Sequence, residues 1–406
     1  MKLQKQADPQ KINNQTDEKQ VLQCYDLWND CFGDSKEYMG YYFENKLKDN
    51  QVYVIEEEDQ VISMLHLNPF SMSLKGREHV YHYIVGVATQ EEKRGRGCMR
   101  NVLTKALREQ REAGEIFTYL MPAAKEIYLP YDFRYIYTQD RVSGSITSDA
   151  ALSSNRVVKP YMELSDHQKQ EVVLFVMEHL EGEFELYTVR DKAYYERLVL
   201  EMQAAGGEVI AVYNDLKLEG VCSYMLENGH MEVVETITSP ELTEQIENAI
   251  LSYALIHAKE KSLQVAWLET HFLNRKVLQA LIQDSEYKKQ PIIMARLLDA
   301  EQALSLLTLK KEEENAVTLK LAVRDPLILE NQKTYKVTAS MTQTVVEETE
   351  EDYEVYMNIA ELTQFFFESA SINELAFETK GMEKSQAITI LEKFSGCKNS
   401  YINEIV

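Results

Sequence analysis

A short basic turn is the segment whose residue types and spacing best suit chemistry. Three cations are interspersed with two glycines in the sequence KRGRG at residues 93–97. Residues 79–88 before it have the alternating apolar pattern of a strand, and residues 98–113 after it carry apolar side chains at helical spacing. A helix start exposes backbone N–H groups and the positive end of the helix dipole, and glycine leaves room for an approaching phosphate. The turn therefore predicts an anion-binding site, although a glycine pair alone would indicate only a tight turn.

The elements around this turn form one region that we expect to end near residue 150, where the sequence becomes polar and typical of a linker. The first twenty residues lack periodicity, and we expect a mobile arm there. The patterns predict helices at residues 21–32 and 38–47, strands at 51–55, 61–67 and 117–121, and a tyrosine-rich segment at 127–137.

The middle region, residues 151–298, repeats the order of the first. Its patterns predict helices at 165–180 and 193–204, strands at 208–213, 219–226 and 231–237, a helix at 240–261, a strand at 264–268, a helix at 274–284 and a strand at 292–298. A counterpart of the basic glycine turn is missing, so we expect no second active site.

The last region, residues 299–406, changes character. Strand patterns rich in threonine and valine at 316–323 and 334–346 precede helical patterns at 359–369 and 385–394. The acidic run at 347–352 is typical of a solvated loop. We therefore expect three α/β domains with mixed sheets.

The composition excludes several classes of protein. The chain has 406 residues and a formal net charge of -23, which repels phosphate backbones, so we expect no nucleic-acid partner. The same charge can attract cationic ligands or serve solubility alone. No stretch approaches the roughly 20 apolar residues of a membrane helix. The five cysteines are scattered without a CxxC pair, which favours reduced thiols in the cytoplasm and no metal site.

The basic turn resembles a motif of the GCN5-related N-acetyltransferases. RGRGCM, residues 94–99, is similar to their arginine-x-x-glycine-x-glycine/alanine signature, which grips the pyrophosphate of coenzyme A. Met99 stands where the general signature has a small residue, and one branch, the Eis (enhanced intracellular survival) family, commonly has a bulky aliphatic residue there. Ile127 and Tyr128, followed by Tyr131 and Phe133, resemble a further Eis segment.

The resemblance covers nearly the whole chain and implies its domain order. It implies a mobile arm at residues 1–20, a catalytic acetyltransferase domain at 21–150, a degenerate acetyltransferase-like domain at 151–298 and a sterol-carrier-like domain at 299–406 whose C-terminus reaches the active site. It also implies acetyl-CoA as cosubstrate. The residues that would contact it are Val87, Ala88, Thr89, Arg94, Gly95, Arg96, Gly97, Cys98, Met99, Arg100, Ala123 and Ala124.

Acetyl transfer to an amine needs a base, a polarised thioester carbonyl and a proton for the departing thiolate. The resemblance places Tyr128 beside the thioester as general acid, with Tyr131 as its nearest rival. It makes the terminal carboxylate of Val406 the general base, for which Glu404 could substitute.

Three other residues near the motif are weaker candidates. His82 and Glu126 could act as bases, but a lone histidine on an alternating strand is more often structural. Cys98 could act as a nucleophile, yet no partner histidine is discernible. Direct transfer in a ternary complex is therefore preferred.

The acceptor is thinly encoded. The region that walls the acceptor pocket in this family resembles a segment that contains Asp26, Trp28, Asp30 and Asp34. These carboxylates and the aromatic ring would suit a cationic primary amine, such as an aminoglycoside, a polyamine or lysine. A helix face exposed to solvent is an equally good interpretation of the same residues. Eis relatives also form hexamers, which implies a homo-oligomer.

The sequence thus predicts a cytoplasmic, acetyl-CoA-dependent N-acetyltransferase. Two alternatives stay open: a lipid-binding or scaffolding protein with a vestigial acetyltransferase domain, and an aminoacyl or long-chain acyl transferase.

Overall fold

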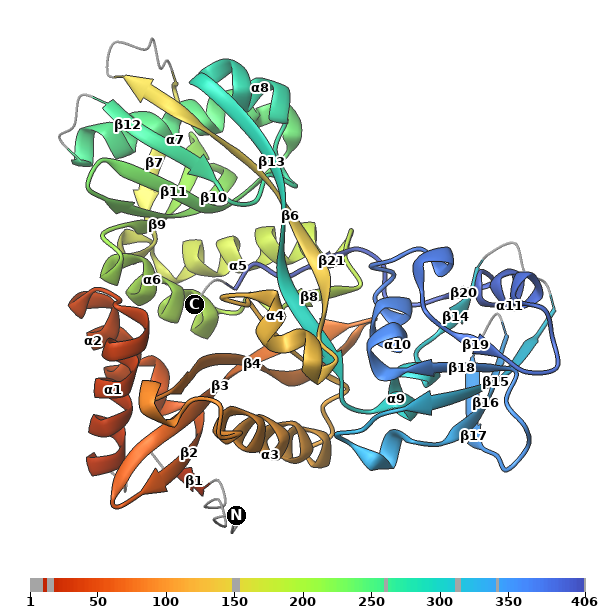
Figure 1. Cartoon of the computed structure of the whole chain (residues 1–406). Coiled ribbons are helices and arrows are strands. Elements are labelled where there is room, and N and C mark those ends of the chain that lie inside the picture. The colour runs from red at the N-terminus through yellow and green to blue at the C-terminus, as the bar shows by residue number, and fades with distance from the viewer. Residues whose placement is uncertain are drawn as a thin grey trace.

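The computed structural model describes residues 10–12, 18–147, 154–258, 262–310, 315–340 and 343–404. Most strands join one 14-stranded mixed sheet, and a separate 5-stranded sheet forms in the C-terminal region (Figure 1). The fold is therefore mixed α/β, as the sequence predicts. In the described part of the chain, no helix is long and apolar enough to cross a membrane.

The N-terminal region places two helices and four antiparallel strands before the basic turn. Its elements are β1 (Gln10–Ile12), α1 (Glu18–Phe32), α2 (Lys36–Glu44), β2 (Gln51–Glu57), β3 (Gln60–Leu74), β4 (Arg77–Thr89), α3 (Cys98–Glu112), β5 (Phe117–Leu120), α4 (Lys125–Tyr128) and β6 (Arg134–Thr147). Part of the segment expected as a mobile arm is strand β1, which pairs with β2. Because β1 pairs with the sheet edge through backbone hydrogen bonds, its side chains show no periodic pattern from which a strand could be predicted.

The middle region repeats this order, as predicted. Its elements are β7 (Val157–Pro160), α5 (Asp166–Glu181), β8 (Leu186–Thr188), α6 (Lys192–Ala204), β9 (Glu208–Asn214), β10 (Lys217–Glu227), β11 (His230–Thr238), α7 (Thr243–Ala258), β12 (Ser262–Trp267), α8 (Arg275–Leu281) and β13 (Gln283–Leu297). In both regions a helix connects two neighbouring parallel strands: α3 lies between β4 and β5, and α7 lies between β11 and β12.

Two long strands, β6 and β13, join the two regions into one sheet. Strand β6 pairs with β12 at its C-terminal end, whereas β13 pairs with β5 at its own C-terminal end and with β6 along most of its length. Figure 1 shows both strands running from one half of the molecule to the other. The sequence predicted only the last part of β13, because its first half is polar and exposed and lacks the apolar alternation of a strand.

The C-terminal region packs its own sheet against helix α10. Its elements are α9 (Ala300–Ser305), β14 (Thr308–Leu309), β15 (Val317–Arg324), β16 (Thr334–Ala339), β17 (Thr344–Glu348), β18 (Val355–Asn358), α10 (Ile359–Phe366), β19 (Glu378–Thr379), α11 (Lys384–Leu391), β20 (Phe394–Ser395) and β21 (Ser400–Tyr401). The single strand predicted at residues 334–346 is the hairpin β16–β17.

Strand β21 leaves this C-terminal domain and returns to the large sheet. It pairs with β8, which in turn pairs with β3 of the N-terminal region. The end of the described chain therefore lies against the sheet that carries the basic turn (Figure 1).

Candidate active site

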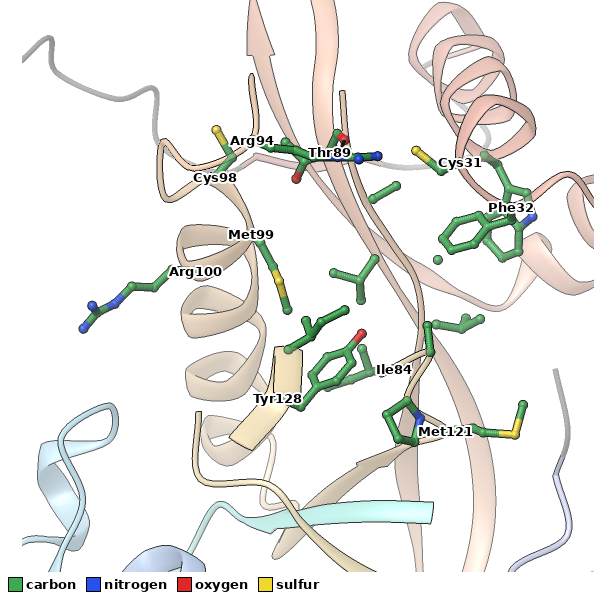
Figure 2. A pocket seen from close by; sticks show the side chains of 18 of the residues that line it. Cys31, Phe32, Ile84, Thr89, Arg94, Cys98, Met99, Arg100, Met121 and Tyr128 are labelled. Atoms are coloured by element: carbon green, nitrogen blue, oxygen red, sulfur yellow. Dashed lines mark hydrogen bonds between the residues drawn. The ribbon is translucent and has the colours of Figure 1, made fainter. Parts of the chain in front are cut away.

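A cavity of about 1050 Å³ opens where strands β4 and β5 separate. The register pairs these two parallel strands only at Tyr83 with Tyr119. Beyond that pair, residues 84–89 of β4 form one wall, residues 121–123 after β5 form another, and the start of α3 closes the far end (Figure 2).

Gly86 explains the shape of the β4 wall. Its φ is 59°, and the β3–β4 register shifts between Met64 and His66, opposite this glycine. A Cβ at Gly86 would overlap the ring of Trp28, which is buried against this strand and also lines the cavity. Glycine therefore lets β4 bulge and lets α1 approach the strand.

The start of α3 has the backbone geometry of the anion-binding site that the sequence predicts. Gly95 and Gly97 have φ values of 73° and 82°, and Gly97 caps the helix without a side-chain hydrogen bond. The backbone N–H groups of the first turn are thus left for a ligand. The Nε of Arg94 donates to the carbonyl of Thr89 at 3.2 Å, which joins the turn to the end of β4.

Two basic side chains at this end, those of Lys93 and Arg100, contribute less positive charge to the cavity than their positions in the sequence suggest. The ammonium of Lys93 pairs with Glu57 of β2 and lowers the pKa of that carboxyl. The guanidinium of Arg100 points away from the cavity in Figure 2.

The predicted coenzyme A residues mostly gather around this cavity. The described residues of that set that line it are Val87, Ala88, Thr89, Arg94, Gly95, Gly97, Cys98, Met99, Arg100 and Ala123. Arg96 and Ala124 are not among its lining residues. Ala124 instead caps helix α4, and Arg96 is exposed on the turn.

Tyr128 ends helix α4 and points into the cavity from the side opposite β4. Its side chain is 8% exposed, and its hydroxyl is directed into the space between α3 and β4 (Figure 2). Burial raises the pKa of Tyr128 to about 12, so the phenol keeps its proton at neutral pH. The hydroxyl makes no hydrogen bond to any residue in the described ranges, which leaves it for a ligand. Tyr131 also lines the cavity, and burial raises its pKa too.

Helix α1 and the start of α2 form the third wall. Trp28, Phe32, Asp34 and Tyr38 line it, and the indole Nε1 of Trp28 donates to Asp34 at 2.7 Å. Asp26 and Asp30 do not line the cavity and are exposed on α1, as the solvated-face reading expects.

Comparisons with known proteins agree with this geometry. Residues 12–136 match the family model described as an acetyltransferase (GNAT) domain. The N-terminal region therefore has the GNAT fold. Residues 300–402 match the family model described as a sterol carrier protein domain. A search of the curated proteins found no match to the sequence. The fold is thus a GNAT architecture with a sterol-carrier-like domain at its end, and acyl transfer is the activity that it supports.

Solved structures with the same fold span nearly the whole chain. A probable N-acyltransferase from Enterococcus faecalis is 19% identical, has a TM-score of 0.71, and covers 97% of this chain and 99% of its own. A GCN5-related N-acetyltransferase from Kribbella flavida is 15% identical with a TM-score of 0.72, covering 98% of each chain. Eis1 from Mycobacterium abscessus is 12% identical with a TM-score of 0.67, covering 98% of this chain and 100% of its own.

Of the three weaker candidates, His82 and Glu126 do not line the cavity, whereas Cys98 does. Nδ1 of His82 pairs with the buried carboxylate of Glu115 at 2.7 Å, and the backbone N–H of His82 donates to the same carboxylate at 2.9 Å. Glu126 is exposed on α4. Cys98 packs its buried side chain in the core under α3, and burial raises the pKa of its thiol. These surroundings suit a structural role for His82 and disfavour a thiolate at Cys98.

The C-terminal segment approaches the GNAT sheet, although Val406 lies outside the described residues. Asn403 accepts a hydrogen bond from Gln139 of β6 at 2.6 Å and donates to the carbonyl of Val234 at 2.9 Å. Glu404 is buried and pairs with Nη1 of Arg190 at 2.9 Å. It lines a separate small cavity of about 30 Å³, so its side chain is committed to Arg190 and not to the main cavity.

Some lining residues carry no motif and were not predicted. Tyr83, Met121 and Pro122 enter the cavity only because β4 and β5 separate there. Gly86 did carry a signal, since a glycine inside a strand pattern often marks a bulge or a close backbone approach.

Proposed function

We propose that this protein is an acetyl-CoA-dependent N-acetyltransferase that acts on a primary amine of a cationic molecule. One observation carries the proposal: a single cavity joins the anion-binding start of α3 to the hydroxyl of Tyr128. Phosphates at the glycine turn would leave the pantetheine arm to run between the separated strands, with the thioester near Ala123 and Tyr128.

In the proposed reaction the amine nitrogen attacks the thioester carbonyl directly. The C–N bond forms, the C–S bond breaks, and Tyr128 donates its proton to the departing thiolate sulfur. With its pKa raised to about 12, the phenol remains a proton donor throughout the neutral range. The proton that the amine loses must pass to a base.

We propose the terminal carboxylate of Val406 as that base, by resemblance to the Eis family. Residues 400–404 support it, because β21 and Asn403 hold the preceding segment against the large sheet. A terminal carboxyl has a pKa of about 3.5 and is intrinsically a weak base, so it would act as the C–N bond forms or through a water.

The acceptor wall supports a cationic substrate. Asp34 is the one carboxylate among the described residues that line the cavity, and Trp28, Phe32 and Tyr38 offer aromatic faces beside it. A carboxylate next to aromatic rings attracts ammonium groups. An aminoglycoside, a polyamine or a lysine side chain would fit this chemistry.

The test measures thiol release from acetyl-CoA with a panel of amines, for wild type, Tyr128→Phe, Tyr131→Phe and a chain extended beyond Val406. Amine-dependent release that falls about 100-fold in Tyr128→Phe and in the extended chain, but little in Tyr131→Phe, is the expected result. Unchanged release in the extended chain would reject the terminal carboxylate.

The same assay separates the alternatives. Preference for a long-chain acyl or aminoacyl donor over acetyl-CoA would indicate the other transferase class. If the protein shows no turnover and does not bind acetyl-CoA, a lipid-binding or scaffolding protein is indicated. The cytoplasmic location and the domain limits near residues 20, 150 and 298 stay predictions from the sequence. The homo-oligomer stays a prediction from the resemblance, and light scattering tests it.

A further inference from the structure

The loop that follows Tyr128 is held by two arginines from the two strands that join the halves of the sheet. Nε of Arg296 in β13 donates to the carbonyl of Tyr131 at 3.1 Å. Nη1 of Arg134 in β6 donates to the carbonyl of Phe133 at 2.9 Å. Phe133 is fully buried, and its ring meets the Tyr128 ring edge-on at 5.8 Å. The two arginines therefore fix the backbone that carries the proposed acid.

Each of these arginines is paired with a carboxylate of the sterol-carrier-like domain. Nη2 of Arg296 contacts Oδ1 of Asp325 at 2.5 Å, and both side chains are 0% exposed. Nη2 of Arg134 lies 3.9 Å from Glu361 of α10.

Asp325 is itself rigidly held. Its Oδ1 accepts the backbone N–H groups of Leu327 and Ile328, each at 3.0 Å, and its Oδ2 accepts from Nδ2 of Asn331 at 2.9 Å. A buried ion pair is weak evidence for stability but fixes geometry when every polar atom is satisfied.

The same Asp325 loop also contacts the helix that starts at the anion-binding turn. Nε and Nη2 of Arg108 in α3 both lie 3.4 Å from the carbonyl of Leu327. Leu327 and Ile328 are buried in the same core cluster as Tyr128 and Phe133. The Asp325 loop of the C-terminal domain thus contacts both α3, which starts at the basic turn, and the loop that follows Tyr128.

We propose that the sterol-carrier-like domain acts as a scaffold for acetyl transfer, with Arg296 and Asp325 as positioning residues for Tyr128. The inference rests on the proposed function, because it assigns these residues a task in the step that Tyr128 performs. Arg296 lies 165 residues along the chain from the carbonyl it binds, so only the fold brings this arrangement together.

The test is a double-mutant cycle with Tyr128→Phe, using steady-state kinetics. Asp325→Asn in the wild-type background is expected to lower kcat at least 10-fold while the KM for acetyl-CoA changes less than about twofold. In the Tyr128→Phe background the same change is expected to alter kcat less than about twofold, because the group it positions is gone. Asp352→Asn, which removes an exposed carboxylate of the same domain paired with Lys380, is the matched control and should leave kcat unchanged.

Glu361→Gln keeps the inference testable if Asp325→Asn does not fold. Its pair with Arg134 is partly solvated, and a smaller loss of kcat, about threefold, should likewise vanish in the Tyr128→Phe background. Equal losses in both backgrounds, or no loss at all, would overturn the inference while leaving the proposed function intact. A Tyr128→Phe enzyme with wild-type kcat would overturn the acid assignment and this inference together.

Discussion

At the scale of single residues, Gly86 sets the geometry of the cavity wall. Its positive φ and its contact with Trp28 leave no room for a side chain, in contrast to Gly76, whose φ of 76° is also positive but which has no atom within 4 Å of an added Cβ. Comparing an alanine substitution at each glycine therefore distinguishes the destabilisation caused by backbone strain from that caused by steric overlap.

Gly86→Ala is expected to destabilise the protein by about 3 kcal/mol, because it adds overlap with Trp28 to the strain of a positive φ. Gly76→Ala should cost only about 1 kcal/mol, from strain alone. Urea unfolding measures both, and equal costs for the two variants would contradict the role of the Trp28 contact.

Glu247 of α7 gives a pH-dependent prediction. Burial raises its pKa to about 7, against an ordinary value of 4.5, although Oε2 accepts a hydrogen bond from Trp267 at 2.8 Å. Between these two pH values the folded state holds a proton that the unfolded state has lost. The contribution of Glu247 to stability therefore falls as pH rises from about 4.5 to about 7.

Relative to Glu247→Gln, the wild-type free energy of unfolding should decline between pH 5 and pH 7 with a slope approaching about 1.4 kcal/mol per pH unit. Chemical unfolding at several pH values measures this slope. Glu241→Gln, at an exposed position just before the same helix, is the control and should show no such trend. A difference that does not change with pH would show that Glu247 keeps an ordinary pKa.

At the scale of elements, the start of α3 is the feature that favours an anion. Its first turn has no side-chain cap, and Arg94 lies at the cavity beside it. Backbone N–H groups, the helix dipole and a nearby cation act on the same bound charge.

Arg94→Glu should weaken coenzyme A binding about tenfold or more, and the loss should shrink at high salt, because the added carboxylate repels phosphate. Calorimetric titration with coenzyme A and with pantetheine, which lacks the phosphates, checks the cause. Arg77→Glu, an equal charge change at the exposed first residue of β4, should have little effect. An equal loss of pantetheine affinity would argue against phosphate recognition by this turn.

At the scale of the whole molecule, β6 and β13 make the two similar regions depend on each other. Strand β5 has β13 as its outer neighbour, and the C-terminal end of β6 has β12. Neither region can complete its sheet from its own contiguous sequence.

A fragment of residues 1–150 is therefore expected to lack fixed tertiary structure, because β5 and β6 would expose unpaired edges and apolar faces. Near-ultraviolet circular dichroism and coenzyme A binding by the fragment measure this. A fragment that unfolds cooperatively and binds coenzyme A would show that the exchange of strands is dispensable.

The sequence alone determined the local parts of this protein. Alternating apolar residues placed β4, glycines and arginines placed the turn at residues 93–97, and helical spacing placed α3, because each signal lies within a few residues of the structure it specifies. The same local signals identified the repeated order of the middle region, whereas the family resemblance identified Tyr128 as a candidate acid.

Only the tertiary structure decided how these parts meet. The polar half of β13 takes its strand conformation from pairing with β6, so its own sequence carries no periodic signal. Three contacts join residues that are far apart in the chain: Trp28 packs against Gly86, Glu404 pairs with Arg190, and Arg296 binds both Tyr131 and Asp325. Such contacts depend on packing and on pairing of buried charges across elements, and no spacing along the sequence encodes them.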